Sequence, residues 1–257
     1  MNPVLNHALF SVYPYIAAAS LFLGSLLRFD TDQYSWRSKS SQLLRTRQFA
    51  LGSNLFHWGI LVIFVGHFVG LLTPVELFHA FGISNGFKQV MAAGVGGVAG
   101  LMAWVGLSIL LHRRFSDVRI RKTSSFSDNL VIVLLWVQLT LGLITVPYSL
   151  AHPSGEEMVK FMAWAQSIVY LKLGAAEHVM DAPLIFKLHL VLGMTILLLA
   201  PFTRLVHIWS APVWYLMRSW QIVRTRKRFQ SKPVASPAKA STPVAPRPVA
   251  PEAVPAE

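Results

Sequence analysis

Residues 183–210 form an apolar segment long enough to cross a bilayer, and this segment contains two histidines, His189 and His207. On one continuous helix these positions return to nearly the same face and lie roughly 27 Å apart. A neutral imidazole in hydrocarbon needs partners for its ring nitrogens, and polar side chains within a membrane normally face the interior of the helix bundle. The segment therefore predicts a partner inside the membrane near each surface.

The composition places this segment in an integral membrane protein, because 54% of the 257 residues are hydrophobic and only 13% are charged. Four further apolar runs have about the 20-residue length that a spanning helix needs. These runs are Leu9–Leu27, Phe49–Leu72, Val90–Leu111 and Asn129–Val146. We expect Pro74 and Pro147 to end the second and fourth spans, because proline lacks a backbone donor. The prediction is an all-α protein with five transmembrane helices.

Lysine and arginine are concentrated in two loops and in the C-terminal segment, whereas the other loops contain little besides Lys88, Lys160 and Lys172. The basic residues are Arg28, Arg37, Lys39, Arg45 and Arg47 after the first span, Arg113, Arg114, Arg119, Arg121 and Lys122 after the third, and Arg218, Arg224, Arg226, Lys227 and Arg228 after the fifth. The positive-inside rule then predicts an N-terminus outside and a C-terminus inside. The net charge of +12 is explained by this topology, so no nucleic-acid partner is expected.

Three segments outside the spans have distinct compositions. The first ten residues contain no lysine or arginine, so we expect the first span to be retained rather than removed as a signal peptide. Residues 151–182 include helical apolar spacing and are expected to lie on the outer surface. A short helix is expected after Pro212. We divide the chain into a membrane domain, residues 1–228, and a disordered Pro/Ala-rich cytoplasmic tail, residues 229–257.

The second span contains two more histidines, His57 nearer its inner end and His67 nearer its outer end. Because the second and fifth spans are antiparallel, only two pairings are level: His67 with His189, and His57 with His207. Two stacked b-type haems require such pairs, since each iron takes one imidazole from each helix. The two spacings differ by roughly 12 Å, which we expect helix tilt and a kink at Pro201 to absorb.

Histidine is the residue type expected to hold a cofactor here, because the chain contains no cysteine for iron–sulfur clusters or covalent haem attachment. The alternative for each spanning histidine is an ordinary buried polar side chain, but four in two level pairs favour haem. The histidines expected to be ordinary surface residues are His7, His79, His112, His152 and His178. Arg204 is expected near the ligand face, where it pairs with a haem propionate or extends to the inner interface.

Long motifs around these histidines resemble a known family. They are NLFHWGILVIFVGHFVGLLTP in the second span, the pair Lys88-Gln89 opening the third, and FKLHLVLGMTILLLAPFTRLVHIWSAPVWYL in the fifth. SVYPYIAAASLFLGSLLRFDTDQYSWRSKSSQ and MAWAQS are also similar. Over about residues 8–228 the chain resembles the gamma subunit of membrane-bound respiratory nitrate reductase, the dihaem cytochrome b that anchors that complex.

The resemblance implies roles for particular residues. It gives His67 and His189 to an outer haem b, and His57 and His207 to an inner haem b. It also implies a quinol site beside the outer haem, formed by His67, Gly66 and Lys88. There a lysine can donate a hydrogen bond to a quinone oxygen and stabilise negative charge. The alternative is that Lys88 only caps the outer end of the third span at the interface.

The function implied by the resemblance is oxidation of a membrane quinol near the outer face of the bacterial cytoplasmic (inner) membrane. Protons leave outside, and electrons pass through the two haems to a cytoplasmic iron–sulfur subunit and a molybdenum catalytic subunit that reduces nitrate. Two alternatives stay open from the sequence. One is the same quinol-oxidising dihaem anchor serving a sulfite- or heterodisulfide-type reductase, and the other is a structural anchor whose histidines bind nothing.

Overall fold

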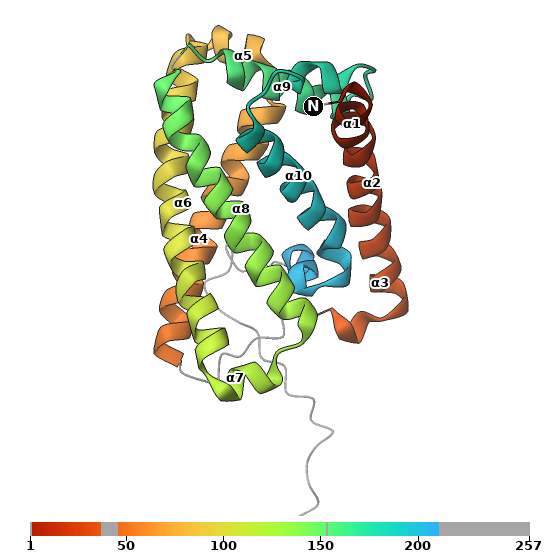
Figure 1. Ribbon diagram of the computed structural model, residues 1–257, viewed down its shortest axis with the longest axis vertical. Coiled ribbons are helices and arrows are strands. Elements are labelled where there is room, and N and C mark those ends of the chain that lie inside the picture. The colour runs from red at the N-terminus through yellow and green to blue at the C-terminus, as the bar shows by residue number, and fades with distance from the viewer. Residues whose placement is uncertain (1, 37–45, 153, 211–257) are drawn as a thin grey trace, which may run out of the picture. The chain divides into compact units, whose positions relative to one another are not determined.

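A computed structural model describes residues 2–36, 46–152 and 154–210, all of which belong to one compact unit, Met1–Ala211. The helix expected after Pro212 and the tail lie outside the described residues. Within the described ranges the chain is helical throughout and contains no strand (Figure 1). Five helical stretches are long and apolar enough to cross a membrane, as predicted. They are Pro3–Thr31, Arg47–Leu72, Asn85–Ser116, Phe126–Ala151 and Leu184–Phe202.

The first span is built from five consecutive helical pieces. They are α1 (Pro3–His7), η1 (Ala8–Val12), α2 (Tyr13–Ala19), η2 (Ser20–Gly24) and α3 (Ser25–Thr31), of which η1 and η2 are π-helical turns. Pro14 has no backbone N–H to donate to Phe10, and the Trp164 indole donates to that carbonyl oxygen at 2.9 Å instead. The span starts before the predicted Leu9 because the Asn2 side chain caps α1.

Helices α4 (Thr46–Leu72) and α6 (Asn85–Ser116) pack closely through glycines. A Cβ on Gly106 would lie 2.4 Å from the Phe56 nitrogen, and a Cβ on Gly59 would lie 2.6 Å from the Ala103 nitrogen. Both glycines are therefore required for this approach, in agreement with the general role of small residues between membrane helices. Helix α6 exceeds its predicted bounds, because Ser84 caps it at one end and it continues through polar residues to Ser116.

Helix α8 (Phe126–Ala151) packs on α6, and α10 (Leu184–Leu199) packs on both α8 and α2. The prediction that Pro147 ends the fourth span is wrong, because Pro147 lies inside α8 and the helix continues to Ala151. Within a membrane span the freed carbonyl groups can be satisfied locally, so an internal proline is tolerated.

The fifth span is not one continuous helix. Helix α10 ends at Leu199 and is followed by two 3₁₀ pieces, η5 (Ala200–Phe202) and η6 (Arg204–Ser210), separated by the extended residue Thr203. The expectation that His189 and His207 share one stripe of a single helix is therefore wrong. The reason is Pro201, which cannot donate a backbone hydrogen bond and which produces a complete break instead of a kink.

Short helices lie at the two ends of the bundle (Figure 1). At one end are α5 (Val75–Ala80), α9 (Glu156–Val169) and η4 (Ala175–Val179), and at the other are η3 (Gln33–Ser35) and α7 (Val118–Thr123). Helix α9 packs against α4 and α6, and it lies within the predicted amphipathic segment 151–182.

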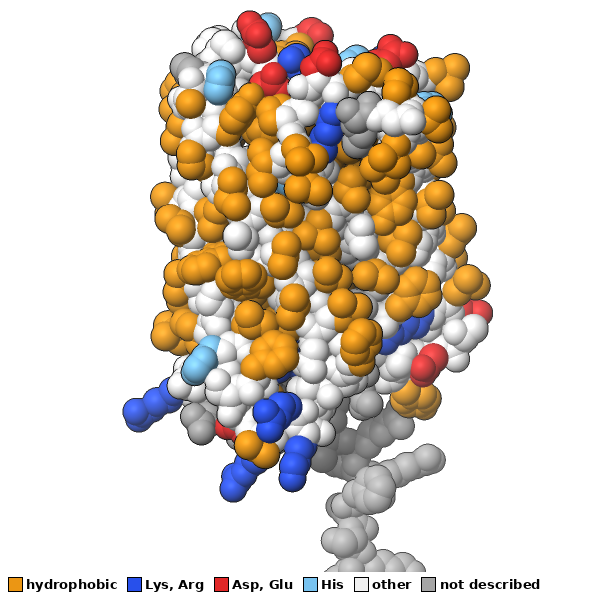
Figure 2. Space-filling view, viewed as in Figure 1, with side chains coloured by type: hydrophobic (Ala, Val, Ile, Leu, Met, Phe, Trp, Pro, Cys, Tyr) orange, Lys and Arg blue, Asp and Glu red, His pale blue; other side chains and the backbone are white. Residues whose placement is uncertain are grey.

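Charges on the face drawn in Figure 2 are concentrated at the two ends, and hydrophobic side chains cover the middle. Lysine and arginine gather at the end near α7, whereas acidic side chains gather at the end near α9. This arrangement suits a protein that spans a bilayer. The orientation of the termini stays a prediction.

Candidate functional site

The four histidines of the spans lie as two facing pairs. The ring centres of His57 on α4 and His207 on η6 are 6.4 Å apart, with the rings inclined at 70°. The ring centres of His67 on α4 and His189 on α10 are 6.3 Å apart, with the rings inclined at 42°. The structure thus brings together the two combinations that the antiparallel arrangement predicted. The break at Pro201 is what lets His207 reach the level of His57.

Three of these histidines are oriented by a backbone carbonyl oxygen close before them in the chain. The Nδ1 atoms of His57, His67 and His207 lie 2.7, 2.9 and 2.6 Å from the carbonyl oxygens of Ser53, Ile63 and Arg204 respectively. A carbonyl oxygen only accepts, so Nδ1 must carry the proton and Nε2 keeps its lone pair. A histidine that ligates a metal almost always donates its other ring nitrogen in this way.

His189 is held differently. Its Nδ1 is buried and has no hydrogen-bond partner among the residues that the structure describes. The Gln138 side-chain nitrogen on α8 donates to the His189 carbonyl oxygen at 3.1 Å and lies 3.4 Å from Nε2. Gly142, also on α8, leaves room for the ring, because a Cβ there would lie 3.0 Å from the His189 Cε1. Helix α8 therefore shapes the pocket that holds this side chain.

The surroundings of the histidine pairs are apolar and only partly covered by protein. Within its most apolar 18-residue stretch, α4 is only 6% buried inside the protein, whereas the corresponding stretch of α6 is 28% buried. His57 and His67 are exposed, as are the large neighbours Leu61, Phe64 and Phe68. The described residues contain no group of three or more His, Cys, Asp or Glu side chains suited to a metal ion, so each pair supplies two ligands.

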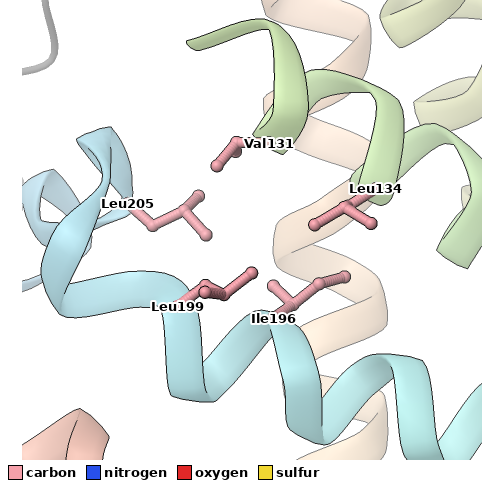
Figure 3. A pocket seen from close by; sticks show the side chains of 5 residues that line it. All are labelled: Val131, Leu134, Ile196, Leu199 and Leu205. Carbon is pink, nitrogen blue, oxygen red and sulfur yellow. The ribbon is translucent and has the colours of Figure 1, made fainter. Parts of the chain in front are cut away.

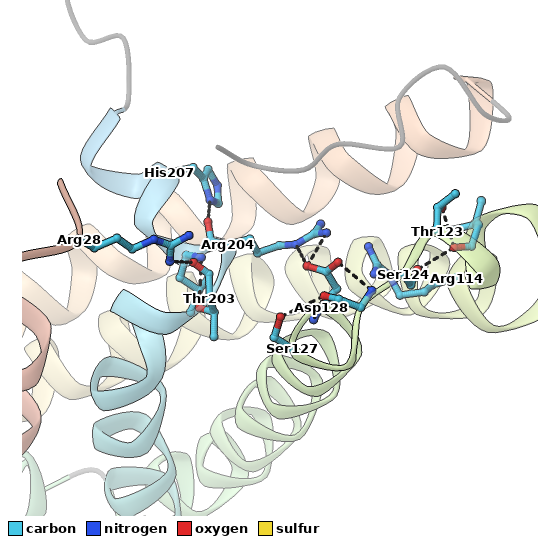
Figure 4. A network of polar contacts seen from close by, with 12 residues as sticks. Arg28, Arg114, Thr123, Ser124, Ser127, Asp128, Thr203, Arg204 and His207 are labelled. Carbon is cyan, nitrogen blue, oxygen red and sulfur yellow. Dashed lines mark hydrogen bonds and ion pairs between the residues drawn. The ribbon is translucent and has the colours of Figure 1, made fainter. Parts of the chain in front are cut away.

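The inner pair adjoins a polar network at the break of the fifth span (Figure 4). Asp128, at the start of α8, accepts from Arg204 Nε at 3.0 Å and forms an ion pair with Nη2 at 2.9 Å. The expectation that Arg204 pairs with a haem propionate or extends to the inner interface stays a prediction. Arg204 holds Asp128, and its backbone carbonyl oxygen accepts from His207.

Lys88 is buried close to His67, with 3% of its surface exposed. Its ammonium donates to the Gly70 carbonyl oxygen at 3.0 Å and to the Met162 sulfur at 2.9 Å, and it lies 3.7 Å from the centre of the Phe78 ring. Gly70 is one helical turn from His67, so Lys88 belongs to the outer pair. The Lys88 charge is enclosed by protein, and both the quinol role and the alternative of a lysine that caps the outer end of the third span stay predictions.

Gly66 precedes His67 on α4, and nothing lies within 4 Å of the position that its Cβ would occupy. Gly66 and His67 lie toward the C-terminal end of α4, and Lys88 of α6 reaches the same end through its hydrogen bond to Gly70. A separate apolar gap, with no room for a water molecule, lies between α8 and the end of the fifth span (Figure 3). Its lining consists of Val131, Leu134, Ile196, Leu199 and Leu205. It is smaller than ordinary ligand pockets and has no polar group, so we regard it as a packing gap.

Sequence reasoning missed three polar residues around the pairs. Asp128 follows Ser125 in a capping-box pattern and reads as a helix cap, a role that it also has. Arg28 reads as a topology charge, and Gln138 is a single amide in an apolar run. The only sequence signal for Gln138 is that an intramembrane amide needs partners, which does not say where they lie.

Fold and site together define the class of this protein: a helical membrane protein that holds four histidines in two facing pairs, one pair toward each end of the bundle. Comparison with known sequences narrows the class. A family model described as nitrate reductase gamma subunit matches residues 6–226, and the chain belongs to that family. Membership places it among the membrane subunits of respiratory nitrate reductases, as the motifs of the spans predicted.

Individual relatives agree with this assignment over nearly their whole length. The chain is 50% identical to the respiratory nitrate reductase 1 gamma chain of Escherichia coli over 222 residues, which are 86% of this chain and 98% of the relative. It is 39% identical to the nitrate reductase gamma chain of Bacillus subtilis over 218 residues, 85% of this chain and 97% of the relative.

Proposed function

We propose that each facing histidine pair holds one haem b, His57 with His207 the inner and His67 with His189 the outer. Two metal–nitrogen bonds of about 2 Å, plus about 1.1 Å from each nitrogen to its ring centre, would separate two opposed imidazoles by about 6.2 Å. The ring centres are 6.4 and 6.3 Å apart. This agreement is the observation that carries the proposal.

The chemistry of the ligands supports haem over a bare metal ion. Each pair offers two imidazoles, so His57 with His207 and His67 with His189 would each hold one haem b. The apolar, thinly covered surface around α4 suits a flat hydrophobic group. When bound, the two haems supply a path for single electrons between the two ends of the bundle.

The chain's own residues would bind the quinol and stabilise its anion at the end where Lys88 lies. The ammonium has three donors, and the Met162 sulfur is a weak acceptor that a quinol oxygen can replace. A cation at this oxygen stabilises the negative charge that appears when the first proton leaves. Gly66 would give the quinol ring access to His67, because no side chain fills the space beside Gly66.

The overall reaction balances across the membrane. Oxidation of one quinol to quinone releases two protons on the outer side and two electrons to the chain. The electrons leave at the inner end for an iron–sulfur subunit and then a molybdenum subunit, where two electrons and two protons convert nitrate to nitrite and water. The gamma-chain names of the relatives support a complex with other nitrate reductase subunits. The iron–sulfur and molybdenum subunits and the location in the bacterial cytoplasmic membrane are part of the proposal.

Haem content of histidine variants tests the proposal. The wild-type protein, purified with its associated subunits, should contain two haems b per chain. Each of His57→Ala, His207→Ala, His67→Ala and His189→Ala should remove one haem, and the His57 and His67 variants should remove different ones. The matched control is His112→Ala, which changes an exposed histidine at the end of α6 and should retain both. Two haems in any of the four variants would refute that ligand, and none in the wild type would leave a structural anchor.

A further inference from the structure

The break in the fifth span leaves backbone carbonyl groups that need donors. Pro201 interrupts the hydrogen bonding of the helix, and the chain passes through the extended residue Thr203 before η6 begins. Within a membrane protein each such carbonyl has to be satisfied by the protein itself. His207 lies four residues beyond Thr203, so its position depends on how this segment is held.

Arg28, on the first span, donates hydrogen bonds to carbonyl groups at the break. Nη1 of Arg28 donates to the carbonyl oxygens of both Pro201 and Thr203, the latter at 2.9 Å. Nε and Nη2 of the same guanidinium donate to the Ser35 hydroxyl at 3.0 Å and to the Ser35 carbonyl oxygen at 2.9 Å. Figure 4 shows the Arg28 side chain reaching Thr203 from the neighbouring helix. One planar group thus ties the break to the turn after α3.

The same part of the chain contacts the break at two further points. A Cβ on Gly24 would lie 3.0 Å from the Pro201 Cβ, so the absence of a side chain there lets the proline pack directly on the first span. At the far end of η6, the Trp36 indole donates to the Ser210 hydroxyl. The first span and its following turn therefore hold both ends of the segment that contains His207.

We propose that Arg28 is a positioning residue for the inner histidine pair: it fixes the broken segment so that His207 faces His57. This inference rests on the proposed function of that pair. Asp128 acts from the opposite side through Arg204, whose carbonyl oxygen orients the His207 ring. A lysine cannot replace Arg28, because one ammonium has three donors from a single point, whereas the guanidinium spreads its donors over acceptors on two segments.

The test uses Arg28→Gln and Arg28→Lys in the complete complex, with Arg121→Gln as the matched control. Arg121 lies on α7 at the same end of the bundle, is exposed, and loses the same charge. We expect Arg28→Gln to lower occupancy of the inner haem at least twofold, or to shift its midpoint potential and low-spin spectrum, with Arg28→Lys intermediate. The outer haem should stay fully occupied, which shows that the variant is folded.

A second measurement does not depend on haem. Hydrogen exchange of the amides in residues 203–207 should be at least tenfold faster in Arg28→Gln than in Arg121→Gln. Ser35→Ala, which removes one acceptor of Arg28, should give a smaller change in the same direction. Wild-type exchange together with a wild-type inner haem in Arg28→Gln would overturn the inference. If the wild-type protein contained no haem but exchange were faster in Arg28→Gln, the proposed function would be refuted. The role of Arg28 in fixing the broken segment would still stand.

Discussion

At the residue scale the four histidines differ in how firmly they are held. Carbonyl oxygens fix the rings of His57, His67 and His207, whereas the buried Nδ1 of His189 has no hydrogen-bond partner among the described residues, and Gln138 lies 3.4 Å from its Nε2. The pairing itself could be predicted from spacing and antiparallel order. Gln138 and Arg28 could not, because their partners come from other helices and depend on the path of the chain at Pro201.

Lys88→Ala should lower quinol-driven turnover by about two to three orders of magnitude, the usual effect of losing one preorganised donor to a developing negative charge. Both haems should remain, and artificial donors that reduce the soluble subunits directly should still support nitrate reduction. Steady-state kinetics with a soluble quinol analogue give the measurement. Lys172→Ala, an exposed lysine beyond α9, is the control. Turnover within a few-fold of wild type would move the quinol site away from Lys88.

Asp128→Ala should destabilise the protein because it leaves the Arg204 guanidinium, 21% exposed, without its carboxylate. Breaking a buried pair from one side costs about 3–5 kcal/mol, and the partial exposure of Arg204 favours the lower end. The thermal unfolding midpoint should fall. A double variant, Asp128→Leu with Arg204→Met, should recover part of the loss because no unpaired charge is left. If the double variant lost as much stability as the two single substitutions combined, a direct interaction between Asp128 and Arg204 would be contradicted.

At the scale of elements, the five spans were predictable because apolar length is a strong signal, but their ends were not. Pro147 lies inside α8 and leaves the helix intact, whereas Pro201 stops a helix completely. The same residue type gives opposite results because Arg28 can satisfy carbonyl groups beyond Pro201. The outcome at each proline therefore depends on donors from distant parts of the chain, which the local sequence does not describe.

Gly106→Ala should separate α4 from α6, because the new Cβ would lie 2.4 Å from the Phe56 nitrogen. Since both histidines of α4 move with that helix, we expect a lower unfolding midpoint and reduced content of both haems. The control is Gly94→Ala on the same helix α6, where nothing lies within 4 Å of the added methyl group. Equal haem content and stability in the two variants would show that the close contact is not needed.

At the scale of the whole molecule, the charges at the two ends indicate a direction across the membrane. The family match ends at residue 226, so the Pro/Ala-rich tail lies beyond the part shared with the relatives. All predicted roles of the membrane domain lie before that point. What the structure leaves as a prediction is which end faces out, and this direction decides on which side the quinol protons are released.

Single introduced cysteines can determine that direction, because the chain has no cysteine of its own and every label reports one position. Lys172→Cys lies beyond α9 at the Lys88 end, and Lys122→Cys lies on α7 at the opposite, basic end; both residues are exposed. By the positive-inside rule, an impermeant maleimide should label Lys172→Cys in intact spheroplasts, and Lys122→Cys only after the membrane is opened.

The reverse pattern would place Lys88 at the cytoplasmic face. Quinol protons would then be released in the cytoplasm while the electrons crossed outward to the other histidine pair, so the reaction would not acidify the medium. With the predicted orientation, protons appear outside while electrons cross inward, so acidification of the medium by spheroplasts given quinol and nitrate should accompany the predicted labelling. Labelling and acidification thus test the same arrangement independently, and they should agree.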